Sequence, residues 1–203
     1  LASVGCSAGD GDRMLVPAGV IDDALAACPR VYRLVARREE NSHAVDPDPE
    51  QIYVHNMGEA AILLDPLTAE SRPSMFVDQV ASGRVMHHLK HQHSVNPLVT
   101  PQDVPGELTP LYSYLALAGE TDKYLAGPGV SLTAQVGYLH EMATAVIGDP
   151  GSGYVLDLAF SPVPPMQLGG EVSKGLVAAA RAGLVCEILP APTTGTTSPA
   201  PVA

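Results

Sequence analysis

The chain has 203 residues, of which 46% are hydrophobic and 16% charged, and its 22 acidic and 11 basic side chains give a formal net charge of −11. This hydrophobic fraction excludes a disordered tail and suits one large domain, or a smaller one with an appendage. The negative charge repels phosphate backbones and anionic lipids, so we expect neither a nucleic-acid nor a membrane partner. We find no secretory leader and no apolar run near the ~20 residues of a membrane span, which favours a cytoplasmic protein.

The first part of the chain, residues 1–92, reads as a lead-in of β-hairpins and helices. A short helix is predicted over Val20–Ala27, where Pro29 ends it, and a longer one over Pro73–Lys90. Between them, pairs of Asp and Pro separate short apolar runs, a spacing that predicts hairpins. The runs are Val31–Ala36, Ile52–Val54 and Ala61–Leu64.

The second part, residues 93–203, alternates apolar runs with helical patterns, as βα units around a parallel sheet do. The runs are His93–Val99, Lys123–Gly127, Tyr154–Phe160 and Val185–Leu189, and their starts are 30, 31 and 31 residues apart. A (β/α)8 TIM barrel of roughly 250 residues needs about 31 per unit. We therefore predict an α/β fold in which residues 93–203 form about the first four units of such a barrel, and we expect the chain to be part of a longer protein.

Two helices between these runs are visible as apolar stripes. The first is carried by Leu132, Val136, Leu139, Ala143, Val146 and Ile147, which fall on one helical face. The second is weaker and spans Val172 to Ala180, with Gly183 suited to its C-terminal end. Both helices should pack on the outside of the sheet.

Candidate binding residues follow from position, because ligands of parallel βα folds bind beyond the carboxyl ends of the strands. The loop after the first run carries Gln102 and Asp103, and the Asp103 carboxylate could meet a cation or could cap a helix. Ser161 follows the third run. The loop after the fourth run is rich in hydroxyls and backbone donors, and reads either as a ligand loop or as a linker. Its candidate residues are Thr194, Gly195, Thr196 and Thr197.

Other chemistry is disfavoured by the sequence. His87 and His91 are i,i+4 neighbours, a zinc-site spacing, but no Glu stands between them and they precede the first barrel strand, so we predict a solvated helix end and no metal. No nucleophile elbow and no phosphate-binding glycine template is present. The odd number of cysteines, with Cys186 inside an apolar run, favours reduced thiols. We expect Lys123 to form a salt bridge at the amino end of the barrel.

Several stretches resemble, in collinear order over essentially the whole chain, the trimethylamine methyltransferase family. These stretches are Cys28-Pro29, Leu34-Val35-Ala36-Arg37, Gln102-Asp103-Val104-Pro105, Thr121-Asp122-Lys123, Ser161-Pro162-Val163, and Leu189-Pro190-Ala191-Pro192 leading into Gly195-Thr196-Thr197-Ser198-Pro199. The resemblance agrees with the barrel that the βα spacing predicts independently.

The resemblance implies methyl transfer from a methylated amine to the cobalt of a partner corrinoid protein. The donor would be trimethylamine or a quaternary amine such as glycine betaine, and carboxylates or aromatic faces would stabilise its charge. No cofactor would be bound directly, because the partner carries the corrinoid, and the full-length protein would be a homo-oligomer. The resemblance assigns no catalytic residue within this chain.

Two other functions stay open on the sequence alone. An unrelated TIM-barrel lyase or aldolase would place a lysine or metal-binding carboxylates at the strand ends, where only Asp103 qualifies. A non-catalytic binding module would use the acidic surface to meet a basic partner.

Overall fold

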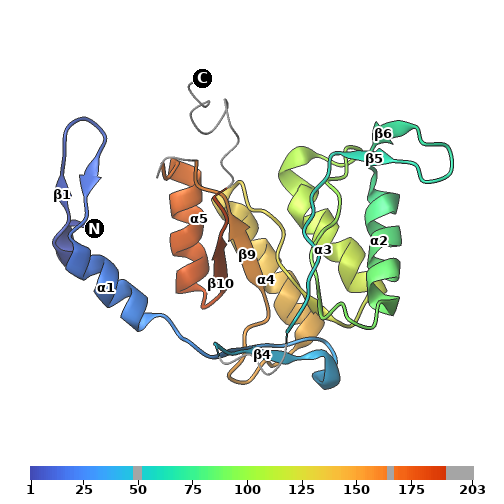
Figure 1. The fold of residues 1–203 in the computed structure, drawn as a ribbon, viewed down its shortest axis with the longest axis horizontal. Coiled ribbons are helices and arrows are strands. Elements are labelled where there is room, and N and C mark those ends of the chain that lie inside the picture. The colour runs from blue at the N-terminus through green and yellow to red at the C-terminus, as the bar shows by residue number, and fades with distance from the viewer. Residues whose placement is uncertain (48–51, 164–166, 191–203) are drawn as a thin grey trace.

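The structure is a computed structural model that describes residues 1–47, 52–163 and 167–190, and it is a mixed α/β fold (Figure 1). The predicted α/β class is therefore confirmed. None of the helices in these ranges is long and apolar enough to cross a membrane.

The chain begins with an arm that lies apart from the body, drawn in blue in Figure 1. Its elements are the 3-10 helix Ala2–Val4, the antiparallel pair β1 (Ser7–Ala8) and β2 (Met14–Leu15), and α1 (Ala18–Ala27). The predicted helix is confirmed, whereas β1 and β2 are too short to leave a pattern in the sequence. No residue of α1 is buried.

Two further hairpins confirm the extended runs before and after residue 50. They pair β3 (Tyr32–Leu34) with β4 (His43–Val45), and β5 (Ile62–Leu64) with β6 (Ser71–Pro73). Asp65 organises the second turn, because its Oδ1 accepts the backbone N–H groups of Leu67 (2.8 Å) and Thr68 (3.1 Å). Ile52–Val54 is not part of a strand, but the Val54 carbonyl accepts the N–H of His93 at 2.9 Å.

The four predicted barrel runs each contain a strand, and the strands are parallel. Their bounds are β7 (Ser94–Val95), β8 (Tyr124–Leu125), β9 (Asp157–Phe160) and β10 (Val185–Ile188). β7 pairs with β8, and β9 with β10, in parallel register. A parallel bridge between Gly129 and Ala159, with Val130 N donating to Ala159 O at 3.1 Å, joins the two pairs. The strands thus lie side by side in chain order.

A layer of helices covers one face of these strands (Figure 1). It comprises α2 (Phe76–His88), α3 (Thr109–Glu120, preceded by the 3-10 turn Gly106–Leu108), α4 (Thr133–Ile147) and α5 (Gly170–Arg181). The predicted helices correspond to α2, α4 and α5. No apolar stripe predicted α3. This helix packs between α2 and α4 and therefore buries side chains on several faces.

Side chains alternate between the two faces of the strands. Those facing the helices, among them Val95, Leu125 and Leu158, form the main hydrophobic core. The opposite face carries Ser94, Ala126, Asp157 and Glu187, and these line a cavity instead.

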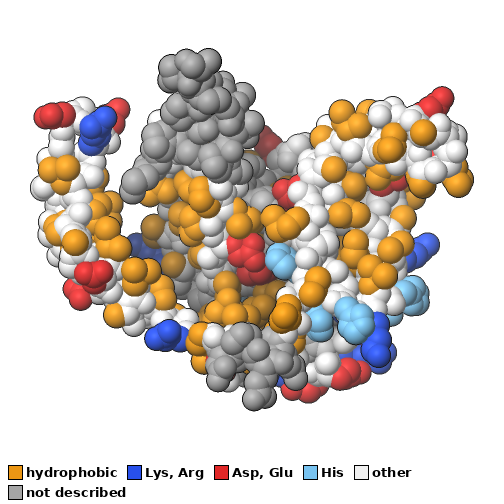
Figure 2. Space-filling model, in the orientation of Figure 1, with side chains coloured by type: hydrophobic (Ala, Val, Ile, Leu, Met, Phe, Trp, Pro, Cys, Tyr) orange, Lys and Arg blue, Asp and Glu red, His pale blue; other side chains and the backbone are white. Residues whose placement is uncertain are grey.

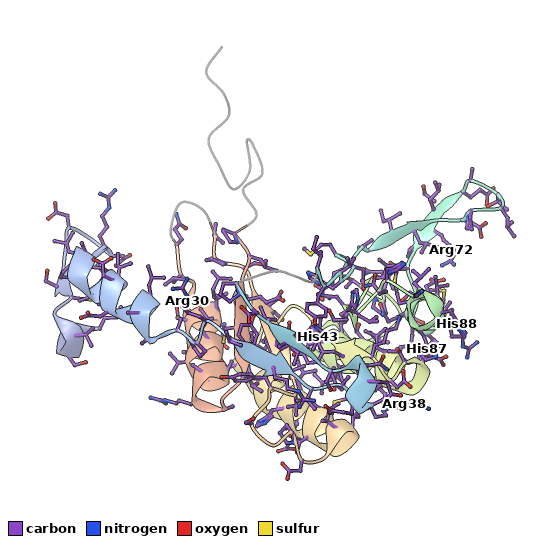
Figure 3. All side chains as sticks on the ribbon, turned by 60° about the horizontal axis from the view of Figure 1, so that its bottom comes forward. Arg30, Arg38, His43, Arg72, His87 and His88 are labelled. Carbon is purple, nitrogen blue, oxygen red and sulfur yellow. The ribbon has the colours of Figure 1, made fainter. Side chains whose placement is uncertain are left out.

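The β3–β4 hairpin closes the amino ends of the strands, as Figure 3 shows from below. Tyr154 N donates to Arg33 O at 2.8 Å and Val35 N donates to Tyr154 O at 2.9 Å, which ties the hairpin to the start of β9. Nearby, Lys123 does not form the predicted salt bridge. Its Nζ donates to the carbonyls of Met86 and Leu89, both at 2.7 Å, at the C-terminal end of α2, where a cation is favourable.

Candidate functional site

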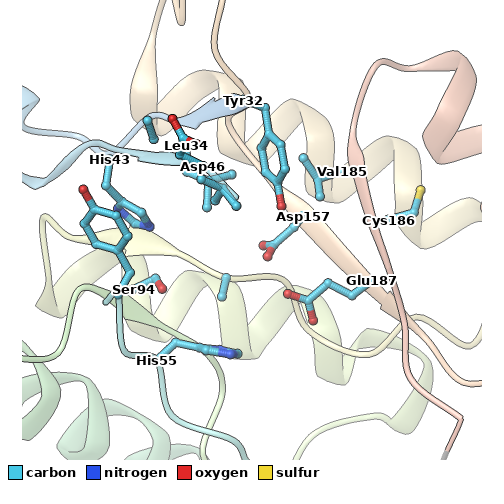
Figure 4. A pocket seen from close by; sticks show the side chains of 14 residues that line it. Tyr32, Leu34, His43, Asp46, His55, Ser94, Asp157, Val185, Cys186 and Glu187 are labelled. Carbon is cyan, nitrogen blue, oxygen red and sulfur yellow. The ribbon is translucent and has the colours of Figure 1, made fainter. Parts of the chain in front are cut away.

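One cavity, the inner cavity, has a volume of about 780 Å³ and lies between the β3–β4 hairpin, residues 53–55 and the strand face opposite the helices. Figure 2 shows acidic side chains and a histidine together in the middle of this face of the molecule. The inner cavity has a polar and aromatic lining, drawn in Figure 4, which includes Tyr32, His43, Asp46, Tyr53, His55, Ser94, Asp157 and Glu187.

Asp157 is the most buried acidic residue of the inner cavity, with 5% of its surface exposed. Its Oδ1 accepts the backbone N–H of Gly127 at 2.6 Å and the hydroxyl of Tyr124 at 3.3 Å. Burial is the main cause that raises the pKa of Asp157 to about 8, and the adjacent Glu187 is the second cause. Both causes favour the protonated form of Asp157.

Glu187 stands beside Asp157 because β9 and β10 are parallel neighbours. Residue 157 pairs with Val185 in the register, so Glu187 lies two residues further along the same face. The adjacent Glu187 carboxyl group disfavours a second negative charge at this point and helps to raise the pKa of Asp157. With Asp157 protonated, the pair carries a single negative charge.

Aromatic rings complete the wall of the inner cavity. The Tyr32 hydroxyl points toward Asp157 in Figure 4, and burial together with the nearby carboxylates raises the pKa of Tyr32. Tyr53 stacks on His43 with ring centroids 4.5 Å apart. Burial lowers the pKa of His43, which favours its neutral form. One negative charge among aromatic rings suits a small organic cation.

A second cavity, the carboxyl-end cavity, has about 430 Å³ and lies where the sequence analysis looked for ligands, beyond β7 and β8. Gln102 and Glu59 line it together with Thr100, Gly129 and Ser131. Asp103 is not in its lining. The Asp103 carboxylate accepts the N–H of Phe76 at 2.8 Å and so caps α2, the alternative to cation binding that the sequence left open.

The other candidate residues are not brought to either cavity by the described part of the chain. Ser161 is exposed directly after β9. Thr194, Gly195, Thr196 and Thr197 lie outside the described residues. A substrate-binding role for these residues stays a prediction.

Asp157 and Glu187 are not among the candidate residues predicted from the sequence, because both lie inside apolar runs that predict buried strands. A usable signal is present. The two acidic residues are 30 apart, which is close to the spacing of the βα units, so they recur at the same phase of successive strands.

The histidines at the end of α2 and after it have separate partners. His87 Nδ1 lies 3.3 Å from Thr121 Oγ1 and 3.5 Å from the Asp122 carboxylate, and His93 Nδ1 accepts the N–H of Val54 at 3.0 Å. Within residues 1–47, 52–163 and 167–190, no group of three or more His, Cys, Asp or Glu side chains could hold a metal ion.

Comparison with known proteins identifies the family. A family model described as trimethylamine methyltransferase (MTTB) matches residues 1–203. The chain belongs to the MTTB family. Among curated proteins of this family, the chain is similar to "Trimethylamine methyltransferase MttB" of Desulfitobacterium hafniense, with 23% identity over 186 residues, which cover 90% of the chain and 37% of that protein. The chain thus spans little more than a third of the length of this MTTB relative.

Proposed function

We propose that the protein transfers a methyl group from a methylated amine to the cobalt of a corrinoid carried by a partner protein. The observation that carries this proposal is the match of the trimethylamine methyltransferase model to all 203 residues. Four parallel strands in chain order, the first three each followed along the chain by a helix, support the further proposal that this part belongs to a (β/α)8 barrel. The barrel would be completed by segments beyond those described, in a homo-oligomeric protein.

The inner cavity is the proposed place of the amine. A methylated ammonium group carries one positive charge, equal and opposite to the charge of the Asp157–Glu187 pair. The rings of Tyr32 and Tyr53 line the same cavity and can present electron-rich faces to N-methyl groups. These residues would orient the cation and would not themselves form bonds to it.

The lining favours trimethylamine over glycine betaine. No Lys or Arg side chain lines the inner cavity in the described residues, so the carboxylate of a betaine would meet Asp157 and Glu187 without a partner of opposite charge. Trimethylammonium has no such carboxylate. We therefore propose a simple methylated amine as the donor.

The reaction balances without a further reactant. The corrinoid of the partner protein would supply a reduced cobalt(I) nucleophile. The methyl carbon would gain a bond to cobalt with the electron pair of that metal, and the carbon–nitrogen bond would break with its pair staying on nitrogen. Trimethylammonium thus becomes neutral dimethylamine and keeps its proton, and the cobalt becomes methylated cobalt(III). The leaving amine is neutral, so it requires no charged group to stabilise it.

The test is a methyl-transfer assay in which the protein is mixed with a reduced corrinoid protein and one amine. The visible absorbance of the corrinoid reports its methylation. We expect methylation with trimethylamine and at least tenfold slower methylation with glycine betaine. If only glycine betaine supported methylation, the proposed substrate would be wrong. If neither amine supported methylation, the proposed function would be wrong.

A further inference from the structure

Residues 53–60, here called the strap, run beside β7 on the side away from β8. They form the extended segment that leads upward to β5 in front of α3 in Figure 1. Parallel bridges join His55 to Ser94 and Ala60 to Val99, and Thr100 N donates to Ala60 O at 2.9 Å. The strap therefore covers the edge of β7 as an additional parallel strand would.

In the middle of the strap, a side chain replaces the backbone in this pairing. Asn56 Oδ1 accepts the N–H of Asn96 at 3.1 Å, and Asn56 Nδ2 donates to the Asn96 carbonyl at 2.7 Å. Gln92 Nε2 donates to the same Asn56 Oδ1 at 3.0 Å. The carboxamide satisfies both backbone groups of Asn96 and fixes the register of the strap.

The strap then passes very close to β7. A Cβ at Gly58 would lie 2.1 Å from the carbonyl oxygen of Pro97, so only glycine fits there. The next residue, Glu59, has φ +75°, a left-handed backbone conformation that residues other than glycine rarely adopt. Its N–H and that of Ala60 both donate to Leu98 O at 3.1 Å.

The unusual backbone of Glu59 aims its side chain across the end of β7. Glu59 Oε1 accepts the N–H of Gly129, which follows β8, at 2.9 Å, and the Glu59 carbonyl accepts Thr100 Oγ1 at 3.0 Å. The side chain thus connects the strap, over one intervening strand, to the second strand of the sheet. The same strap contributes Tyr53 and His55 to the lining of the inner cavity.

We propose that Glu59 is a positioning residue that latches the strap onto Gly129 and so holds Tyr53 and His55 in the wall of the inner cavity. The left-handed conformation costs free energy locally, and the hydrogen bond to Gly129 offsets that cost only while the strap is closed. Loss of the carboxylate should therefore open the strap without unfolding the strands.

Amide hydrogen exchange of the full chain tests the latch directly. In Glu59→Ala, the amides of Ala60 and Thr100 should exchange about tenfold faster, while Val130, whose N–H donates to Ala159 in the joined strands, should be unchanged. Glu59→Gln retains an acceptor for Gly129 and should stay within about threefold of the original protein. Equal protection in Glu59→Ala and the original protein would overturn the proposal.

Glu59→Gly separates the latch from backbone strain. Glycine relieves the strain at φ +75°, so strain alone predicts slower exchange of Ala60 and Thr100, whereas loss of the latch predicts faster exchange. Faster exchange supports the proposal and slower exchange contradicts it. Glu141→Ala, on the exposed side of α4, is the matched control and should change neither amide.

A cation titration links the latch to the inner cavity, and this step rests on the proposed function. Glu59→Ala should weaken binding of trimethylammonium chloride several-fold, and Glu59→Gln should restore it. Absence of binding by the original protein would count against the proposed function alone, because the exchange measurements decide the latch independently. Cation binding that is unchanged in a Glu59→Ala protein with faster exchange would overturn the role of the latch in positioning Tyr53 and His55.

Discussion

Gly127 and Asp157 are in contact through both backbone and side chain at the point where β8 meets β9. Gly127 N donates to the Asp157 carboxylate at 2.6 Å, and a Cβ on Gly127 would lie 1.5 Å from the Asp157 carbonyl oxygen. No other residue type fits at position 127 while the strands keep this separation. The absence of a side chain thus allows the backbone to hold the buried carboxyl group of the inner cavity.

Gly127→Ala is therefore expected to destabilise the fold strongly. The added methyl group meets backbone that cannot rotate away, so we expect a loss of roughly 3 kcal/mol or more in the free energy of unfolding. Urea denaturation followed by circular dichroism measures the loss. Gly137→Ala on α4 is the control, because a Cβ there meets nothing within 4 Å and should be neutral or stabilise the helix by up to about 1 kcal/mol. Equal stability of both variants would contradict the contact.

Asp157→Asn should remove a pH dependence of stability. Because the folded-state pKa of Asp157 is raised to about 8, the folded state holds a proton that the unfolded state has released between about pH 4 and pH 8, and stability falls as the pH rises through that window. The amide resembles the protonated acid, so the variant should gain on the order of 1–3 kcal/mol relative to the original protein between pH 5 and pH 9. Parallel stability curves would show that Asp157 is ionised in the folded protein.

Tyr114→Phe should stabilise the protein. Tyr114 is 1% exposed on α3, and its hydroxyl has no hydrogen-bond partner in the described part of the structure. Removing a buried polar group without a partner should raise the free energy of unfolding by about 1 kcal/mol. Thermal melting measures the change. A loss of stability would mean that the hydroxyl has a partner that the structure does not include.

The spacing of apolar runs predicted the four parallel strands, because strands that lie inside a molecule on both faces are rich in apolar side chains. Three of the helices beside them were also predicted. The spacing could not predict α3, since a helix packed between two others needs apolar side chains on several faces. Nor could it predict the strap, whose pairing with β7 uses the Asn56 side chain and a residue with positive φ. Neither of these two features of the strap leaves a periodic pattern in the sequence.

The candidate site was predicted only in part, for a reason that Asp103 and Asp157 illustrate. Position along the chain placed Asp103 correctly after a strand, but a carboxylate near the start of α2 satisfies free backbone N–H groups and caps the helix. Asp157 was not predicted as a site residue because it lies in an apolar run. A buried carboxyl group needs a partner, and the sequence alone does not identify one. Its partner, Glu187, is adjacent only once β9 and β10 pair.

The role of the inner cavity is tested most directly by titrating trimethylammonium chloride into the protein and into Glu187→Gln at pH 7, with heat or methyl chemical shifts as the readout. We predict saturable binding by the original protein and about 10- to 100-fold weaker binding by Glu187→Gln, because the variant removes the charge of the Asp157–Glu187 pair. Glu141→Gln, on the exposed side of α4, should bind as the original protein does. Binding of equal strength in Glu187→Gln, or no binding by the original protein, would contradict the assignment of the amine to this cavity.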